Sequence, residues 1–447
     1  MDRLRLRLAL WLLPVMVLAL APALPAAQVV PPEGMLRAYV DTPDAAYSWE
    51  RGPERRSALA RESDLLLTSQ VWRGITWRHL VRVFKPAQVA HPGWMVLIIS
   101  GGDGPARTGQ PEHGDEFARR LVATAGVPVA VLYRVPNQPL FGNLYEDEII
   151  SYTFAQFMQT RDRTWPLLFP MVKSAVRAMD ALQAYARQEW RRPVTSFVVT
   201  GCSKRGWTTW LTGAYDRGRR VKAIAPMVID LLNMTKQFPH QVQMWGTHSE
   251  EISEYSSKGL TEILTTPQGR RLVTAVDPYT QRRLLTMPKL LVFGSNDPYW
   301  ATDALNFYWA DLLGPKSLMY CPNTGHEVES DAIGRVTATL GAFVTTVAQG
   351  QSMPTLSWSR AVKGDQVTLA LRAPRATGAR AWVVTADNLD FRPQKWEPMP
   401  LRPAPGGLFV AHLKRPADRN LAVFGEADFR RGGGTYHLST QNIIAAK

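Results

Sequence analysis

The chain has 447 residues, of which 45 % are apolar and 20 % charged, so it can bury a full core and is not intrinsically disordered. Its length predicts more than one domain. The formal net charge of +14 is scattered in short clusters without a zinc-finger or RNA-binding motif, which argues against nucleic-acid binding and favours an anionic surface, an anionic substrate or simple solvation.

The N-terminal segment predicts export. Three arginines within the first seven residues precede an apolar run over residues 8–20, and small residues follow. This order is typical of a signal peptide, which we assign to residues 1–27. The apolar run is short for a membrane span and contains Pro14, so an uncleaved membrane anchor is the less favoured alternative. We expect a periplasmic or secreted protein with no stable membrane span after cleavage.

Strands and helices alternate through the first two thirds of the chain. Residues 28–61 are expected to wrap the surface before the core begins. Four apolar runs then predict strands, the second of them with one exposed face, and three segments with helical spacing predict helices. The predicted strands are residues 65–69, 75–84, 94–99 and 127–133, and the predicted helices are residues 116–125, 146–159 and 170–190.

A strand, a tight turn and a helix follow in immediate succession between Phe197 and Tyr215. The turn contains Gly201 and Ser203 in the spacing of a nucleophile elbow, although the second glycine stands one place late, at Gly206. Such a turn holds the serine hydroxyl above the edge of the sheet, where the N-terminus of the helix stabilises negative charge. On its own the motif is equally compatible with a serine that caps the helix.

Three further strands are predicted, at residues 221–229, 289–293 and 316–320, with helices at 302–313 and 331–348. The polar segment 233–287 is too long for a simple connection, and we interpret it as an inserted lid. This alternation predicts an α/β fold with a parallel sheet covered by helices on both faces. Ligands bind such sheets at the carboxyl ends of the strands.

Ser203, Asp297 and His326 each follow a predicted strand, in the chain order of the α/β-hydrolase triad. A neutral imidazole can take the serine proton, and the acid fixes its tautomer. Separately, Asp297 could cap a helix and His326 could be a turn residue, and Asp230 is a rival acid at the end of another strand. Jointly the three predict a serine hydrolase of α/β-hydrolase fold.

Other residues are expected to complete this site. Oxyanion donors are predicted at the backbone N–H of Lys204 and at one residue of the loop Gly101 to Asp103, which includes Gly102. The side chain of Lys204 or Arg205 is expected to assist there, to bind an anionic substrate group, or only to pair with acidic residues at the surface. Trp245 and Trp300 are predicted to line the cleft.

The two cysteines leave two alternatives open. Cys202 precedes the candidate nucleophile and Cys321 lies five residues before the candidate histidine. They either form a disulfide between the two loops or remain free, buried thiols. Histidine, cysteine and acidic residues show no metal-ligand spacing, so neither a metal nor another cofactor is expected.

The pattern of apolar and polar residues changes after residue 352. Short apolar runs alternate with Pro, Gly and Asp, and helical spacing is absent up to the end of the sequence. The pattern predicts a small β-sandwich domain at residues 351–447, behind a hydrolase domain at residues 28–350.

Several motifs resemble the PhoPQ-activated pathogenicity-related proteins, over nearly all of the mature chain. They are Val135–Pro139, Lys173–Asp180, Gly201–Leu211, Ala223–Asp230 and Asn296–Trp300. The resemblance implies an exported α/β-hydrolase-like protein in a family named for virulence regulation.

The elbow is also similar to that of glucuronoyl esterases, whose basic residue after the serine lies near the oxyanion and whose elbow cysteine is tied towards the histidine loop. Here Lys204 has the basic position, and Cys321 does not adjoin His326.

The sequence therefore predicts an exported esterase that acts through an acyl-enzyme on Ser203, with His326 as base and Asp297 as orienting acid. Its expected partner is a small-molecule or envelope-derived ester. A non-catalytic binding protein on a hydrolase scaffold and a serine peptidase are the alternatives.

Overall fold

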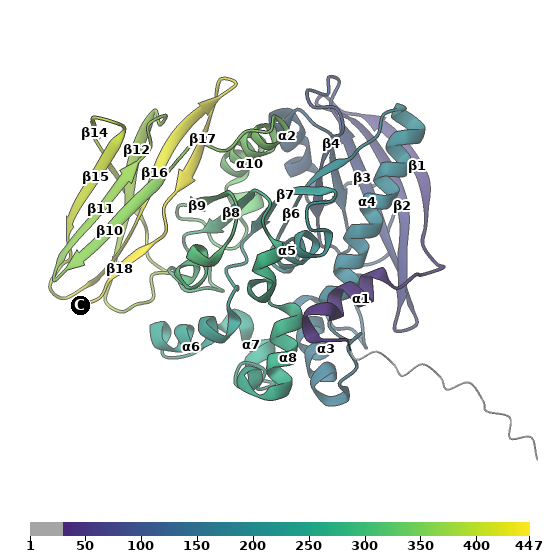
Figure 1. The fold of residues 1–447 in the computed structure, drawn as a ribbon, viewed down its shortest axis with the longest axis horizontal. Coiled ribbons are helices and arrows are strands. Elements are labelled where there is room, and N and C mark those ends of the chain that lie inside the picture. The colour runs from purple at the N-terminus through teal and green to yellow at the C-terminus, as the bar shows by residue number, and fades with distance from the viewer. Residues whose placement is uncertain (1–29) are drawn as a thin grey trace, which may run out of the picture.

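The computed structural model describes residues 30–447 (Figure 1). The predicted signal peptide, residues 1–27, lies outside this range. Within residues 30–447, the search for a helix with the length and apolar character of a membrane span finds none.

A nine-stranded mixed sheet forms the centre of the first domain, in the order β1-β2-β3-β5-β4-β6-β7-β8-β9. Strands β4 to β9 are parallel to one another, whereas β1 pairs antiparallel with β2, β2 with β3, and β3 with β5. The bounds are β1 Ser48–Arg56, β2 Arg61–Trp72, β3 Ile75–Lys85, β4 Trp94–Ile99, β5 Val129–Leu132, β6 Ser196–Cys202, β7 Val221–Met227, β8 Lys289–Gly294 and β9 Lys316–Cys321. This is the α/β-hydrolase-like fold that the sequence predicts.

The predicted parallel sheet needs one correction at its N-terminal side. Arg73 and Gly74 both have positive φ, 53° and 76°, which makes a two-residue turn between β2 and β3 and forces these strands to be antiparallel. Strand β3 is also buried on both faces rather than one, because it lies between β2 and β5 under helices. Its polar Arg82 is fully buried and pairs with Asp64 and Asp115.

Helices cover both faces of the sheet. Met95 and Leu97 of β4 face the core formed with α4 and α5, whereas Val96 and Ile98 face the core formed with α2 and α10, as the period of two along a strand requires. The bounds are η1 Pro32–Gly34, α1 Met35–Asp41, α2 Asp115–Ala125, α3 Glu146–Thr160, α4 Leu168–Trp190, α5 Lys204–Asp216, α9 Val328–Asp331 and α10 Ile333–Ala348.

Two predicted segments differ from the structure. The stretch before residue 61 is part of the core, because α1 buries Met35, Leu36 and Val40 and β1 joins the sheet edge. The helix predicted at 302–313 is two short 3₁₀ turns, η5 Ala304–Phe307 and η6 Trp309–Asp311.

The segment between β7 and β8 is helical and lies beside α3 in the lower part of Figure 1. It contains α6 Met234–Trp245, η2 Glu250–Ile252, α7 Ser253–Ser256, η3 Ile263–Thr265, α8 Pro267–Val276 and η4 Pro278–Leu284. This is the segment predicted to be a lid, and we call it the lid below.

Two antiparallel sheets form the C-terminal part, at the left of Figure 1. One contains β10 Ser357–Lys363, β11 Gln366–Arg372, β14 Pro403–Ala404 and β15 Leu408–Lys414, and the other β12 Gly378–Ala386, β13 Glu397–Pro400, β16 Asn420–Arg431, β17 Gly434–Ser439 and β18 Ile443–Ala445. The division at residue 351 stays a prediction.

The C-terminal sheets pack directly on the first domain. The rings of Tyr320 in β9 and Phe424 in β16 lie 5.1 Å apart, and β17 contacts both α10 and β9. Asn296, next to the candidate acid, donates from Nδ2 to the carbonyls of Arg392 and Gln394 at 2.9 and 2.6 Å. Asn323, in the loop before His326, bonds to the backbone of Trp396 through both ends of its amide.

Candidate active site

Ser203 occupies a one-residue turn between a strand and a helix. Strand β6 ends at Cys202 and α5 begins at Lys204. The backbone of Ser203 has φ 55° and ψ −127°, a sparsely populated conformation that costs about 1–3 kcal/mol and is concentrated at functional sites. Its N–H donates to the carbonyl of Met227 at 2.9 Å, which ties the turn to β7. The structure thus places Ser203 as the elbow motif predicts.

Close backbone contacts explain the displaced second glycine of the motif. A Cβ atom on Gly201 would lie 2.7 Å from the carbonyl oxygen of Ile99, and one on Gly206 would lie 2.7 Å from that of Met227. Both positions therefore require glycine. The side chain of Arg205 extends towards Glu146 and Val135. The position that the second glycine usually occupies can therefore carry a long side chain here.

Asp297 and His326 are joined directly. Nδ1 of His326 lies 2.9 Å from Oδ2 of Asp297, and Oδ1 of Asp297 accepts the N–H of Tyr299 at 2.9 Å. In the neutral imidazole, a proton on Nδ1 makes this hydrogen bond to the carboxylate and leaves the lone pair of Nε2 free. Burial lowers the pKa of His326, but the charge of Asp297 and its hydrogen bond outweigh burial, and the pKa lies above its ordinary value.

Ser203 and His326 line the same two cavities. Nε2 of His326 is buried and has no hydrogen-bond partner among residues 30–447, so no bond joins it to the Ser203 hydroxyl in this structure. Such bonds are often long in a free enzyme and tighten around the substrate. The imidazole of His326 and the hydroxyl of Ser203 thus line the same cavities but are not hydrogen-bonded to each other.

The rival acid, Asp230, has a different environment. Its Oδ1 accepts the hydroxyl of Tyr308 at 2.6 Å, and burial raises its pKa to about 8. A carboxyl group that is protonated at neutral pH cannot stabilise an imidazolium by its charge. Of the two candidate acids, Asp297 is the one that the structure brings to the imidazole.

The predicted oxyanion loop lies beside the nucleophile. Gly101 and Gly102 line the same cleft as Ser203 and Lys204, and Gly102 has φ +107°, which favours glycine. Asp103 is exposed and is not among the lining residues. The backbone N–H groups of Gly102 and Lys204 are thus the candidate donors that border the cleft.

Both predicted cationic side chains are paired with acids from the start of α3. Nζ of Lys204 lies 2.8 Å from Asp147 and 3.1 Å from Glu146. Arg205 binds both oxygens of Glu146 at 2.6 and 2.7 Å and donates from Nε to the carbonyl of Val135 at 2.6 Å. In the structure the guanidinium thus fastens α3 and the loop at Val135 to the elbow.

The two predicted cleft tryptophans have different positions. Trp300 lines the cavity beside Ser203. Trp245 is not among the lining residues, because it lies at the end of α6 with the guanidinium of Arg392 3.8 Å above its ring. The prediction missed Tyr299, which lines both cavities and whose only signal was its place two residues after Asp297.

The disulfide alternative for Cys202 and Cys321 is wrong, and both are free thiols. Cys202 ends β6 and Cys321 ends β9, with β7 and β8 between them. Three strand spacings separate the two by about 14 Å, at about 4.8 Å each, whereas a disulfide needs Cα atoms closer than about 7 Å.

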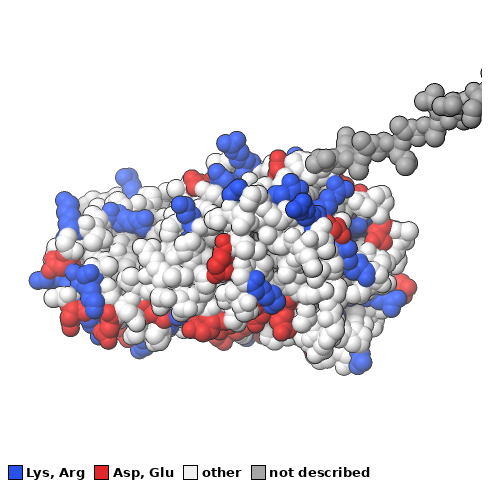
Figure 2. All heavy atoms as spheres, turned by 90° about the horizontal axis from the view of Figure 1, so that it is seen from below, with Lys and Arg blue, Asp and Glu red and all other residues white. Residues whose placement is uncertain are grey.

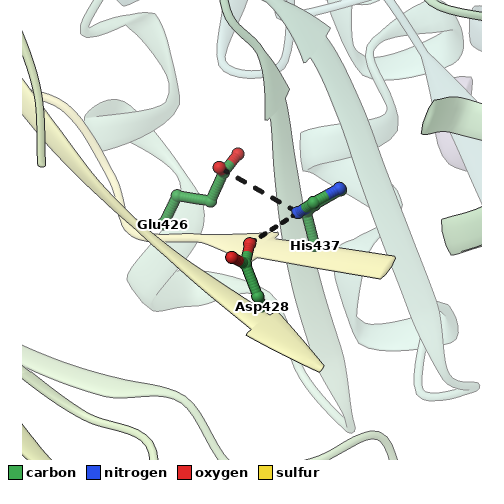
Figure 3. Close-up of side chains that lie close together, drawn as sticks. All are labelled: Glu426, Asp428 and His437. Carbon is green, nitrogen blue, oxygen red and sulfur yellow. Dashed lines mark hydrogen bonds and ion pairs between the residues drawn. The ribbon is translucent and has the colours of Figure 1, made fainter. Parts of the chain in front are cut away.

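One group of potential metal ligands lies away from the cleft. Glu426 and Asp428 of β16 and His437 of β17 bring a ligand atom each to within 4.8 Å of one another (Figure 3). Sequence spacing did not predict the group, because β-pairing assembles it. Arg335 and Arg380 pair with Glu426, and Arg380 also pairs with Asp428, so guanidinium groups already neutralise these carboxylates.

Lysine and arginine residues are dispersed over the face of the molecule shown in Figure 2.

Comparison with known proteins finds a matching protein family. The model of the family described as PhoPQ-activated pathogenicity-related protein matches residues 36–392. The autocrine proliferation repressor protein A of Dictyostelium discoideum is 28 % identical over 425 residues, which are 88 % of this chain and 85 % of that protein.

Among solved structures, an acetyl xylan esterase from Paenibacillus sp. R4 matches with a TM-score of 0.47 at 15 % identity, over 68 % of this chain and 92 % of that one. A glucuronoyl esterase from Solibacter usitatus matches with a TM-score of 0.36 at 13 % identity, over 74 % of this chain and 84 % of that one.

Proposed function

The chain belongs to the PhoPQ-activated pathogenicity-related protein family, and we propose that it is an exported serine hydrolase that cleaves an ester through an acyl-enzyme on Ser203. The observation that carries the proposal is the hydrogen bond between His326 Nδ1 and Asp297 Oδ2. In the neutral imidazole this bond directs the Nδ1 proton to Asp297, so that Nε2 can accept a proton in a cavity that Ser203 also lines.

The chemistry follows from these positions. Nε2 of His326 takes the proton of Ser203 while Oγ bonds to the acyl carbon, and Asp297 stabilises the imidazolium. The imidazolium then gives its proton to the leaving alkoxide as the ester C–O bond breaks. Water repeats the sequence on the acyl-enzyme, which releases the acid and restores the serine. The N–H groups of Lys204 and Gly102 would bind the oxyanion, and one such donor contributes about 10²–10³-fold in rate.

A fluorophosphonate probe tests the nucleophile. The mature chain should be labelled and should hydrolyse short esters, and Ser203→Ala should abolish both. Ser359→Ala, an exposed serine of β10, is the matched control and should behave as wild type. Labelling that persists in Ser203→Ala would refute the assignment. A peptide panel run beside the ester panel separates an esterase from a peptidase.

Export belongs to the same proposal. A basic start, an apolar run and small residues support a signal peptide over residues 1–27. The expected result is a periplasmic or secreted chain whose new N-terminus, read by mass spectrometry, falls between Ala23 and the residue after Ala27. A membrane-bound chain that keeps Met1 would favour an uncleaved anchor.

A non-catalytic binding protein is the second candidate. The observation in its favour is that Nε2 of His326 has no hydrogen-bond partner in the described part of the chain, so no hydrogen bond joins it to Ser203. This alternative predicts a folded chain that neither reacts with the probe nor turns over any ester or peptide.

A further inference from the structure

Two cavities of different character meet at the candidate nucleophile. One has a volume of about 40 Å³ and the other about 360 Å³, measured as the space open to the centres of water molecules. Ser203, Lys204, Tyr299 and His326 line both. A substrate whose carbonyl reaches Ser203 can therefore extend one part into each space.

The smaller cavity is apolar. Its walls come from α5, from the loop after β7 and from the lid, through Trp207, Ile229, Leu231, Met234, Phe238 and Ile252. Its charged groups are matched, because Asp147 binds Lys204 at 2.8 Å and accepts the hydroxyl of Tyr255 at 2.8 Å. Such walls favour an apolar guest, since a polar one would lose its hydration without a partner.

The larger cleft is polar and carries surplus negative charge. Glu112 is neutralised by Arg134 at 2.8 Å, and Glu146 is neutralised by Arg205. Glu327 and Glu329 also line it and form no ion pair within residues 30–447. An anionic group would be repelled there, whereas hydroxyl-bearing or cationic groups would be accepted.

We propose that the substrate joins a short apolar acyl chain, held in the smaller cavity of about 40 Å³, to a polar alcohol without negative charge, held in the larger cleft. This inference rests on the proposed function. The order of events gives the orientation, because the acyl group stays bound to Ser203 while the alcohol must leave and water must enter. The smaller, apolar cavity suits the part that stays, and the larger polar cleft suits the exchange of alcohol for water.

A chain-length series with one leaving group tests the acyl side. For p-nitrophenyl esters from acetyl to palmitoyl, kcat/KM should peak between acetyl and butyryl and fall at least about tenfold for octanoyl, since one methylene changes discrimination about 10-fold or more. Phe238→Ala, which enlarges the cavity, should move the peak to longer chains. Ile252→Phe, which fills it, should move the peak towards acetyl.

Val242→Ala is the matched control, because Val242 lies on the exposed side of the same helix as Phe238. It should keep the wild-type profile. Each variant should first show wild-type labelling by a small methyl fluorophosphonate, which separates misfolding from altered selectivity.

The leaving-group side is tested with one acyl chain on two alcohols. Butyryl glycerol should be hydrolysed at least about tenfold faster than the butyryl ester of glycolate, and the double substitution Glu327→Gln with Glu329→Gln should narrow that ratio. A chain-length profile that Phe238→Ala and Ile252→Phe leave unchanged, or a preference for the glycolate ester, would overturn the inference while hydrolysis itself persists. Absence of both hydrolysis and labelling would overturn the proposed function instead.

Discussion

The ring of Tyr299 lies against the imidazole of His326, with centroids 4.2 Å apart and planes inclined by 31°. The N–H of the same residue holds Oδ1 of Asp297 at 2.9 Å. One residue therefore supports the acid through its backbone and the base through its side chain. A ring at this distance stabilises a cation by about 0.5–2 kcal/mol, so it favours the imidazolium that the proposed reaction forms.

Loss of the Tyr299 ring should change the pH profile of ester hydrolysis. The neutral imidazole is the active form, so kcat/KM rises as the pH passes upwards through the pKa of His326. Tyr299→Leu should move this acidic limb down by about 0.5–1 pH unit, because the charged form loses its stabilising ring. Tyr299→Phe should leave the limb in place. A limb that does not move in Tyr299→Leu would show that the ring acts by packing alone.

The two candidate acids should respond differently to the same substitution. Asp297→Asn removes the charge that fixes the Nδ1 proton, and kcat should fall by about 10⁴-fold. Asp230→Asn replaces a carboxyl that is already neutral near pH 7 and keeps an acceptor for Tyr308, so kcat should stay within a few-fold of wild type. Steady-state kinetics of the two variants at pH 7 decide the matter, and a reversed order would make Asp230 the functional acid.

Asp230 should also make the fold less stable in alkali. Its folded pKa of about 8 lies above its ordinary value of 3.8, so the folded state binds the proton more tightly than the unfolded state. That contribution is complete below about pH 4 and is lost as the pH rises towards 8. The free energy of unfolding, measured by urea denaturation, should therefore fall more between pH 5 and pH 8.5 in wild type than in Asp230→Asn. Equal losses in the two proteins would contradict the raised pKa.

The buried carboxylate of Glu426 should be a structural tie and not a metal ligand. Its side chain is fully buried and pairs with Arg335 of α10 and Arg380 of β12, which are 23 % and 27 % exposed. Glu426→Ala should lower the free energy of unfolding by about 3 kcal/mol, near the low end for a broken buried pair because the arginines keep some solvent. Addition of Zn²⁺ or EDTA should leave the wild-type melting temperature unchanged, and a rise with Zn²⁺ would identify a metal site.

Much of the active-site scaffold could be predicted because its signals are local. Ser203, Asp297 and His326 each follow an apolar run, and the structure places Ser203 directly after β6 and the other two in the loops that follow β8 and β9. The lid was recognisable by the loss of apolar spacing between β7 and β8. These features depend on residues close together in the sequence.

The features that were missed depend on contacts between residues far apart in the sequence and on the order of strands in the sheet. The separation of Cys202 from Cys321 follows from two intervening strands, and the pairing of Arg205 with Glu146 joins residues 59 positions apart. Trp245 was misplaced because its direction depends on how α6 sits in the lid. The stacking of Tyr299 had no distinct signature, since an aromatic residue near an aspartate has many uses.

The amide bonds from Asn296 and Asn323 to the stretch 392–396 have a consequence for the C-terminal part of the chain. They anchor the loops of the acid and of the base to a region that supplies no reacting group. A chain shortened before β10 would keep Ser203, Asp297 and His326 but lose the hydrogen bonds that hold the loops of Asp297 and His326. The C-terminal sheets therefore support the positions of Asp297 and His326, and loss of these sheets in evolution would disturb the site.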